Sequence, residues 1–294
     1  MTESGGTWAF AGSALYGAAM VALLAGCWEG TGPDMLIIGH RGAAGHAPEH
    51  TFVSWDLALE MGVDYLEQDL QMTADGQLIV MHDDTLDRTA RGPNCNGPVI
   101  TRTLAELTGC DAGSWFNDAR PDRARPEFVG QRIPTLDSVL ARYGGRARFY
   151  IETKNPEIAP GMEEALVTLL DQHGLLPWKD EDEIDRVFVQ SFSTASLLRV
   201  RSLNEFLPLV QLFARAETPA AILARLDSLA EFAQGIGPHY SDVDARLIAA
   251  AHERGLVVHP YTVNAPAEMR RLIDIGADGM FTDYPDVLAA ILRR

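Results

Sequence analysis

Short apolar runs alternate with segments of helical periodicity along most of the chain. The apolar runs are expected to be strands, and they lie at Met35–Gly39, Val63–Leu70, Gln77–His82, Arg148–Lys154, Arg186–Phe192, Pro208–Phe213, Phe232–Ile236, Leu256–Val263 and Gly279–Asp283. The periodic segments are expected to be helices, and they lie at Thr51–Met61, Thr135–Tyr143, Met162–His173, Thr194–Leu203, Pro219–Leu229, Asp242–Arg254 and Ala265–Ile275. This alternation predicts a parallel sheet with crossover helices. Because no glycine-rich dinucleotide fingerprint is present, it favours a closed (β/α)8 TIM barrel over a doubly wound sheet.

Two segments depart from this alternation. An Asp75-Gly76 turn signal precedes Gln77–His82, so this run is expected to return along Val63–Leu70 as a hairpin rather than join the barrel. Residues Asp83–Arg132 carry Gly, Pro, Asn and charges, with one short helical stretch at Thr103–Leu107. We interpret this segment as an insertion on a strand-to-helix connection, where barrel enzymes place their substrate loops. The prediction is one barrel domain over residues 35–294, after a leader and linker over residues 1–34.

The charge balance limits the partners of this chain. With 41 acidic and 24 basic residues among 294, the formal net charge is −17. Such a surface repels nucleic acid and anionic lipid headgroups, so neither is an expected partner. A phosphate ester would be repelled as well, and binding one would require local positive charge from a metal ion or from Arg and Lys.

The N-terminal segment differs from the rest of the chain. No charged residue occurs between Ser4 and Trp28, and Leu24-Ala25-Gly26-Cys27 resembles the lipobox of a bacterial lipoprotein signal. The resemblance implies cleavage before Cys27, lipid on its thiol, and an exported periplasmic or membrane-anchored protein. Against this, Glu3 is negative and the first basic residue is Arg41, whereas secretory signals begin with positive charge. An uncleaved anchor and a disordered leader on a cytoplasmic protein are the alternatives.

Cys95 and Cys110 are the remaining cysteines, and both lie in the insertion. In an oxidising compartment they would form a disulfide, which in the chain-entropy model stabilises the fold by roughly 3 kcal/mol. Two unrelated thiols are the alternative. Zinc is not expected, because no Cys-x-x-Cys or His-Cys cluster accompanies them.

Charged and polar residues interrupt the predicted strands at their carboxyl ends. His40 and Arg41 follow the apolar run Met35–Gly39 directly. Glu67 and Asp69 stand two residues apart near the end of the next strand, so they face the same side of the sheet. In a barrel these strand ends meet at one rim, and the side chains are expected to converge there.

The same pattern recurs on two further segments. Glu152 and Lys154 share one face of a strand, and His82 closes the hairpin. Three converging carboxylates form an oxygen-rich site for one hard divalent cation, Mg²⁺ or Ca²⁺, rather than zinc. Two histidines beside it supply a general base and a general acid. Taken singly these residues are typical of ion pairs, caps or turns, and it is their joint placement on one rim that predicts a site.

These residues belong to motifs that resemble the glycerophosphodiester phosphodiesterases. The motifs are Ile38-Gly39-His40-Arg41-Gly42, Ala47-Pro48-Glu49-His50-Thr51, Tyr65-Leu66-Glu67-Gln68-Asp69-Leu70, Val80-Met81-His82-Asp83, Phe149–Lys154, Val189-Gln190-Ser191-Phe192, His259-Pro260-Tyr261-Thr262-Val263-Asn264 and Phe281-Thr282-Asp283-Tyr284-Pro285. The resemblance covers residues 35–294, and Pro-Glu-His-Thr with His-Pro-Tyr-Thr is similar to the exported bacterial branch. It implies hydrolysis of glycerophosphodiesters, such as glycerophosphocholine, to glycerol 3-phosphate and an alcohol.

The resemblance also implies roles for individual residues. By carry-over, Glu67, Asp69 and Glu152 bind the divalent metal. His40 and His82 are the acid/base pair. Our hypothesis is that His40 is the base that activates the nucleophile and that His82 is the acid that protonates the leaving alkoxide. The nucleophile is either water or the neighbouring glycerol hydroxyl, which would give a cyclic phosphate.

The remaining assignments concern the substrate. Arg41 and Lys154 are expected to hold the phosphate, and Phe192 and Tyr261 to flank the glycerol. Glu49 is expected to touch the second shell of the metal or His40. One alternative function is lysophospholipase D or sphingomyelinase D activity on lysolipids, with Gly113-Ser114-Trp115-Phe116 offering an apolar path for an acyl chain. Another is a catalytically inactive binding protein, which would have lost a histidine or a carboxylate ligand, and none is missing.

Overall fold

The computed structural model of the chain describes residues 35–177, 186–215 and 217–294. The expected leader and the lipid attachment site at Cys27 lie outside these residues. Within the described ranges, no helix is both long and apolar enough to cross a membrane.

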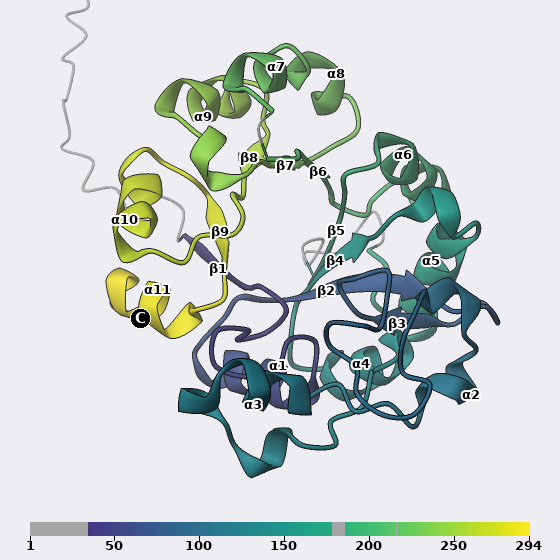
Figure 1. Cartoon of the computed structure of the whole chain (residues 1–294). Coiled ribbons are helices and arrows are strands. Elements are labelled where there is room, and N and C mark those ends of the chain that lie inside the picture. Colours follow the sequence, from purple (N-terminus) through teal and green to yellow (C-terminus); the bar gives the residue numbers. More distant parts are fainter. Residues whose placement is uncertain (1–34, 178–185, 216) are drawn as a thin grey trace, which may run out of the picture. The chain divides into compact units, whose positions relative to one another are not determined.

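Eight parallel strands of the described chain form a ring (Figure 1). In spatial order they are β8 (Val257–Val258), β7 (Gly235–Gly237), β6 (Leu209–Leu212), β5 (Val187–Ser191), β4 (Phe149–Thr153), β2 (Tyr65–Met72), β1 (Leu36–Gly39) and β9 (Gly279–Thr282). The β8 side meets β9 through backbone bonds, in which the N–H of Phe281 donates to Pro260 O (3.0 Å) and the N–H of Val263 donates to Phe281 O (2.8 Å). The predicted TIM barrel is confirmed.

Helices surround the ring (Figure 1). They are α1 (Phe52–Glu60), α4 (Leu136–Tyr143), α5 (Met162–Gln172), α6 (Thr194–Leu203), α7 (Pro219–Leu223), α8 (Leu226–Ala230), α9 (Ala245–His252), α10 (Pro266–Asp274) and α11 (Pro285–Leu292). Side-chain caps fix where several begin, because an unpaired N–H in the first turn finds an acceptor there. Asp244, for example, accepts from the N–H of Leu247 at 2.7 Å. The buried faces of these helices pack on the outside of the strands.

Three predicted boundaries are wrong. The strand expected at Leu256–Val263 shrinks to β8, because Pro260 has no N–H to continue the ladder. The strand expected at Phe232–Ile236 begins only at Gly235, because a turn after α8 occupies the earlier residues. The helix expected at Pro219–Leu229 divides into α7 and α8, where the N–H of Arg225 bonds three residues back to Ile222 O and tightens the turn. Helix α11 was not expected, although Pro285 at its first turn is a start signal.

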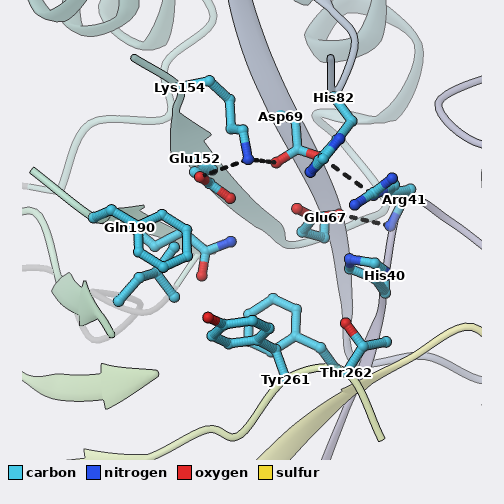
Figure 2. Close-up of a pocket in the computed structure, with 13 residues that line it drawn as sticks. His40, Arg41, Glu67, Asp69, His82, Glu152, Lys154, Gln190, Tyr261 and Thr262 are labelled. Atoms are coloured by element: carbon cyan, nitrogen blue, oxygen red, sulfur yellow. Dashed lines mark hydrogen bonds and ion pairs between the residues drawn. The ribbon is translucent and has the colours of Figure 1, made fainter. Parts of the chain in front are cut away.

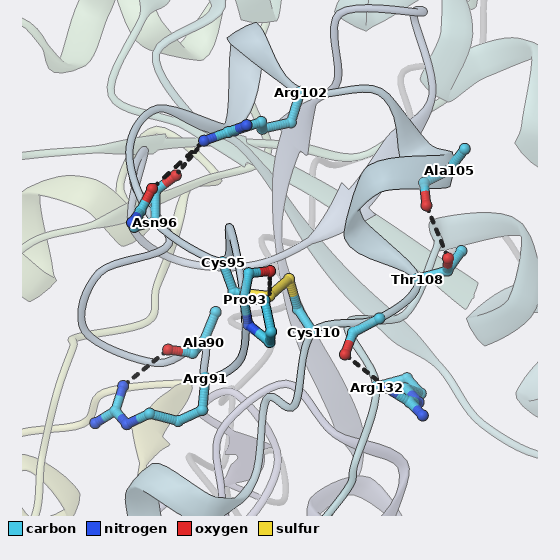
Figure 3. The surroundings of a disulfide bond; sticks show 11 residues. Ala90, Arg91, Pro93, Cys95, Asn96, Arg102, Ala105, Thr108, Cys110 and Arg132 are labelled. Atoms are coloured by element: carbon cyan, nitrogen blue, oxygen red, sulfur yellow. Dashed lines mark hydrogen bonds between the residues drawn. A yellow bond between two sulfur atoms is a disulfide. The ribbon is translucent and has the colours of Figure 1, made fainter.

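The hairpin and the insertion follow β2. Strand β3 (Leu78–Val80) pairs antiparallel with β2 and lies off the barrel path, as predicted. The insertion contains α2 (Leu104–Leu107) and α3 (Ser114–Ala119). Cys95 and Cys110 form a disulfide inside it (Figure 3). Both cysteines belong to a small apolar cluster with side chains of the hairpin, so the bond ties the insertion together over its own core.

This disulfide is expected to stabilise the fold. It closes a separation of 15 residues, for which the chain-entropy model gives about 3 kcal/mol. The Cys95→Ser/Cys110→Ser double variant should therefore unfold in urea with a free energy of unfolding lower by about that amount. Dithiothreitol should lower the wild type to the same value and leave the variant unchanged. Equal urea midpoints for the wild type and the double variant without dithiothreitol would contradict this role.

Candidate active site

A cavity of about 130 Å³ opens at the carboxyl ends of the barrel strands (Figure 2). Its lining includes all the predicted site residues except Glu49, namely His40, Arg41, Glu67, Asp69, His82, Glu152, Lys154, Phe192 and Tyr261. Gln190 from β5 and Thr262 also reach it. The strand-end positions that the sequence singled out are therefore brought together at one rim.

Three carboxylates form the floor of the cavity. Glu67 and Asp69 lie on one face of β2, and the parallel register places Glu152 of β4 opposite Asp69. All three are almost inaccessible, with exposures of 1%, 1% and 6%. Burial and the charge of Asp69 raise the pKa of Glu67 well above its usual value, and they raise the pKa of Glu152 to about 8. Ionising all three carboxylates would therefore place more negative charge here than the chain itself neutralises, and the raised pKa values express that cost.

Two cationic side chains lie against the carboxylates. The Lys154 ammonium is 3.0 Å from Glu152 Oε1 and 3.8 Å from Asp69 Oδ1. Arg41 Nε is 3.5 Å from Asp69 Oδ2, and its backbone N–H donates to Glu67 Oε2 at 2.6 Å. Burial opposes charge on Asp69, but Lys154 and a hydrogen bond from His50 hold its pKa well below the usual value. Arg41 and Lys154 thus place two positive charges beside the cavity, where the sequence led us to expect them.

His50 has no role in the sequence-based assignment, but the structure places it in the cluster. Its Nε2 is 2.8 Å from Asp69 Oδ2, and the ring is buried. Ligand atoms of His50, Glu67 and Asp69 lie within 4.8 Å of one another, which makes them a candidate metal site among the described residues. The residue adopts a left-handed backbone with φ of 54°, a conformation uncommon outside glycine. The motif Pro-Glu-His-Thr contained this residue, but nothing in the motif indicated that the turn directs the ring inward.

Each of the two predicted catalytic histidines is fixed at Nδ1 by a carboxylate. His40 Nδ1 is 2.7 Å from Asp283 Oδ1, and Asp283 also accepts from Asn264 Nδ2 at 2.6 Å. His82 Nδ1 is 2.7 Å from Asp83 Oδ1. This arrangement sets the tautomer and leaves Nε2 of each ring for proton transfer. Burial lowers the pKa of His82 to about 4, although the charge of Asp69 and the bond to Asp83 act in the opposite direction.

Glu49 lies one layer outside the cavity. Its carboxylate accepts from Arg41 at 3.0 Å and is held from the other side by Arg88 at 2.7 and 2.8 Å. The expected contact with His40 is not among the hydrogen bonds of the described residues. Neither Arg88 nor this bridge was foreseen from the sequence, because Arg88 reaches Glu49 only through the fold of the insertion.

Aromatic side chains form part of the wall of the cavity. The rings of Phe192 and Tyr261 meet edge to face at 6.0 Å, and the Tyr261 hydroxyl donates to Phe213 O at 2.6 Å. The other aromatic pair singled out from the sequence lies elsewhere. Trp115 donates to Ala112 O and packs against Phe116, which is buried in the insertion. That pair anchors the insertion and lies outside the lining of the cavity.

Buried carboxylates, paired cations and two anchored histidines at the mouth of a TIM barrel define a phosphoric diester hydrolase. The chain belongs to the glycerophosphoryl diester phosphodiesterase family, whose model matches residues 40–287. This membership confirms the family and the enzyme class predicted from the motifs.

Individual relatives agree with the family match. A glycerophosphodiester phosphodiesterase of Bacillus subtilis (strain 168) is 46% identical over 262 residues, which cover 89% of this chain and 88% of that protein. An Oleispira antarctica phosphodiesterase, solved in complex with the product sn-glycerol-3-phosphate, superposes with a TM-score of 0.74 at 28% identity, covering 88% of this chain and 97% of that one. A glycerophosphodiester phosphodiesterase from Agrobacterium tumefaciens str. C58 superposes with a TM-score of 0.69 at 31% identity, covering 87% of this chain and 99% of that one. These matches give no support to the lysolipid alternative.

The buried carboxylates should destabilise the metal-free protein as the pH rises. The pKa of Glu67 is raised in the folded state, so above about pH 4.5 the unfolded chain releases this proton first. The free energy of unfolding therefore falls with increasing pH until Glu67 is ionised in both states. In EDTA, Glu67→Gln should melt above the wild type by a few degrees, on the scale of about 2–4 °C per kcal/mol, and the gap should widen toward pH 8.

Exposed Glu157 offers the matched control for this experiment. Glu157→Gln should melt like the wild type at every pH. Added Ca²⁺ or Mg²⁺ should raise the melting temperature of the wild type and of Glu157→Gln more than that of Glu67→Gln. A Glu67→Gln protein that melts below the wild type in EDTA across the range would contradict the repulsion described here.

Proposed function

We propose that the enzyme hydrolyses glycerophosphodiesters such as glycerophosphocholine to glycerol 3-phosphate and an alcohol. Catalysis depends on one divalent cation, Ca²⁺ or Mg²⁺, and on His40 and His82 as the acid/base pair. The observation that carries this proposal is the placement of both histidines, each anchored at Nδ1 by an aspartate, beside a buried carboxylate cluster. The product bound in the Oleispira antarctica relative, sn-glycerol-3-phosphate, supports the substrate class.

The chain offers a fitting set of ligands for the cation. Glu67, Asp69 and Glu152 would hold it, because hard divalent cations prefer carboxylate oxygens and a cation would offset the repulsion among these three when they are ionised. When bound, such a cation stabilises negative charge on a phosphate oxygen. Arg41 and Lys154 would hold the other phosphate oxygens by charge-assisted hydrogen bonds.

Proton transfer is assigned to the two histidine rings. Asp283 fixes Nδ1 of His40, so Nε2 accepts the proton of the nucleophile as its oxygen bonds to phosphorus. On the other side, Nε2 of His82 donates a proton to the alcohol oxygen as its bond to phosphorus breaks. Asp83 stabilises the charged form of His82, and the negative charge of a bound phosphodiester acts in the same direction. Water and the neighbouring glycerol hydroxyl, which gives a cyclic phosphate, both suit this arrangement as nucleophile.

The aromatic wall is assigned to the glycerol. Phe192 and Tyr261 present apolar ring surface to the cavity, which suits the CH groups of glycerol. A volume of about 130 Å³ is below the roughly 300–1,000 Å³ typical of sites for larger ligands. This size favours a small headgroup ester over a substrate whose acyl chain must enter the cavity.

Replacing either histidine should remove turnover while the fold persists. His40→Ala and His82→Ala should each lower kcat on glycerophosphocholine by roughly 10²–10⁴-fold, measured as release of glycerol 3-phosphate. His173→Ala is the control, because His173 pairs with Asp137 on the protein surface. EDTA should inactivate the wild type, and Ca²⁺ or Mg²⁺ should restore it. Near-native activity of either active-site variant, or restoration by zinc alone, would contradict the assignment.

We also propose that the protein is exported as a lipoprotein attached through Cys27. The lipobox-like stretch before Cys27 and the disulfide in the insertion support an oxidising compartment outside the cytoplasm. Expressed in full in a bacterial host, the wild type should partition into the detergent phase of Triton X-114, and Cys27→Ala should not. Mass spectrometry of the purified wild type should show a chain that begins at a lipid-modified Cys27. An unmodified Cys27 in the membrane fraction would contradict lipidation.

A further inference from the structure

Arg88 of the insertion pairs with two carboxylates at once. Its NH1 and NH2 groups donate to the two oxygens of Glu49 at 2.8 and 2.7 Å. Its Nε and NH2 groups donate to Asp83 at 2.6 and 3.0 Å. A guanidinium group can do this because its five N–H donors lie in one rigid plane.

Each of these carboxylates holds a residue of the cavity. Glu49 accepts from Arg41 at 3.0 Å, and Asp83 fixes Nδ1 of His82 at 2.7 Å. The contacts run without a break from Arg41 through Glu49, Arg88 and Asp83 to His82. Arg88 is therefore the only member of this chain of contacts that touches both carboxylates, and it lies outside the lining of the cavity.

The Arg88 side chain is 41% exposed, and Trp115 packs against it. Its guanidinium lies over the ring of Trp115 at 5.6 Å, and the Trp115 indole N–H is held by Ala112 O at 2.9 Å. Burial alone would raise the pKa of Glu49, but the hydrogen bond from Arg88 and the charges of Arg41 and Arg88 hold it below the usual value. Without Arg88, Glu49 and Asp83 would face each other as like charges with one cation fewer between them.

We propose that Arg88 is a positioning residue that aligns His82 through Asp83 and Arg41 through Glu49. This inference rests on the proposed function, because it assigns Arg88 to the protonation of the leaving group and to the binding of phosphate. The proton itself passes from Nε2 of His82 to the departing alcohol oxygen as the bond from that oxygen to phosphorus breaks. Arg88 does not touch the substrate and transfers no proton.

The two arms of the Arg88 network have different kinetic signatures. The alkoxide of choline is a poor leaving group and needs a proton as it leaves. By contrast, p-nitrophenolate leaves as a stable anion and gains little from a general acid. Misplacing His82 should therefore lower kcat far more on glycerophosphocholine than on a p-nitrophenyl ester of glycerol phosphate. Misplacing Arg41 should instead raise KM for both substrates, because both carry the same phosphate.

The experiment compares these two substrates on variants of each arm. Asp83→Asn should lower kcat on glycerophosphocholine by roughly 10²-fold and by much less on the p-nitrophenyl ester. Glu49→Gln should raise KM for both substrates and largely preserve the ratio of their kcat values. Arg88→Ala should show both effects. The double variant Asp83→Asn/Arg88→Ala should lose much less kcat on glycerophosphocholine than the product of the two single fold-losses, because both changes break the same contact.

Further variants separate positioning from loss of fold. Arg88→Lys keeps the charge but has no planar fork, so it should retain part of the phosphate binding and lose most of the leaving-group selectivity. Methylguanidinium should restore turnover of glycerophosphocholine by Arg88→Ala. Arg132→Ala is the matched control, because Arg132 also lies in the insertion and donates to the carbonyl of Gly109. Arg132→Ala should keep the wild-type kcat and KM for both substrates.

The outcomes are distinguishable. A wild type that does not release glycerol 3-phosphate from glycerophosphocholine would overturn the proposed function. The role of Arg88 alone would be overturned if the wild type is active but kcat of Arg88→Lys and Arg88→Ala falls by the same factor on both substrates. It would also be overturned if kcat does not fall at all. If Arg88→Ala does not fold, Arg88→Lys and Asp83→Asn still decide the question by their ratios of kcat on the two substrates.

Discussion

The burial of like charges at the mouth of the barrel is the constraint to which the rest of the site responds. The parallel register places Asp69 beside Glu152, and the pleat of β2 turns Glu67 to the same side. A backbone N–H from Arg41, the ammonium of Lys154 and the ring of His50 each reach this cluster. Lys154 and the hydrogen bond from His50 lower the pKa of Asp69, but burial and the charge of Asp69 keep the pKa values of Glu67 and Glu152 raised. A bound cation would favour the ionised form of both side chains, which supports the proposed cation site.

The barrel and the centre of this site were predictable because both follow from short-range periodicity. Apolar runs of strand length that alternate with helical segments specify a parallel barrel, and a parallel barrel brings the carboxyl ends of its strands to one rim. Glu67, Asp69 and Glu152 stand at such ends, so their convergence needed no knowledge of loops. The limits of β7 and β8 were not predictable in this way. Pro260 and the turn after α8 end the ladder inside runs whose composition stays apolar.

The surroundings of the site depend on contacts between distant segments and on loop conformation. The bond from His40 to Asp283 spans 243 positions, and it exists only because β1 and β9 are neighbours in the closed ring. His50 turns inward through a left-handed residue that its motif does not reveal. Arg88 meets Glu49 across 39 positions because the insertion folds back over the hairpin. Such pairings are set by tertiary geometry, which a local pattern does not encode.

The insertion also bears on how the proposed phosphate site overcomes the charge of the protein. A formal charge of −17 would repel a phosphodiester at a distance, so attraction has to arise within a few ångströms of the phosphate. In the proposed function Arg41 and Lys154 supply that charge, but each lies against buried carboxylates that compete for it. Arg88 adds a third cation just outside the cavity, where it pairs with Glu49 and Asp83 and offsets part of their negative charge. The two carboxylates that contact Arg41 and His82 therefore add less to the field that repels a phosphate.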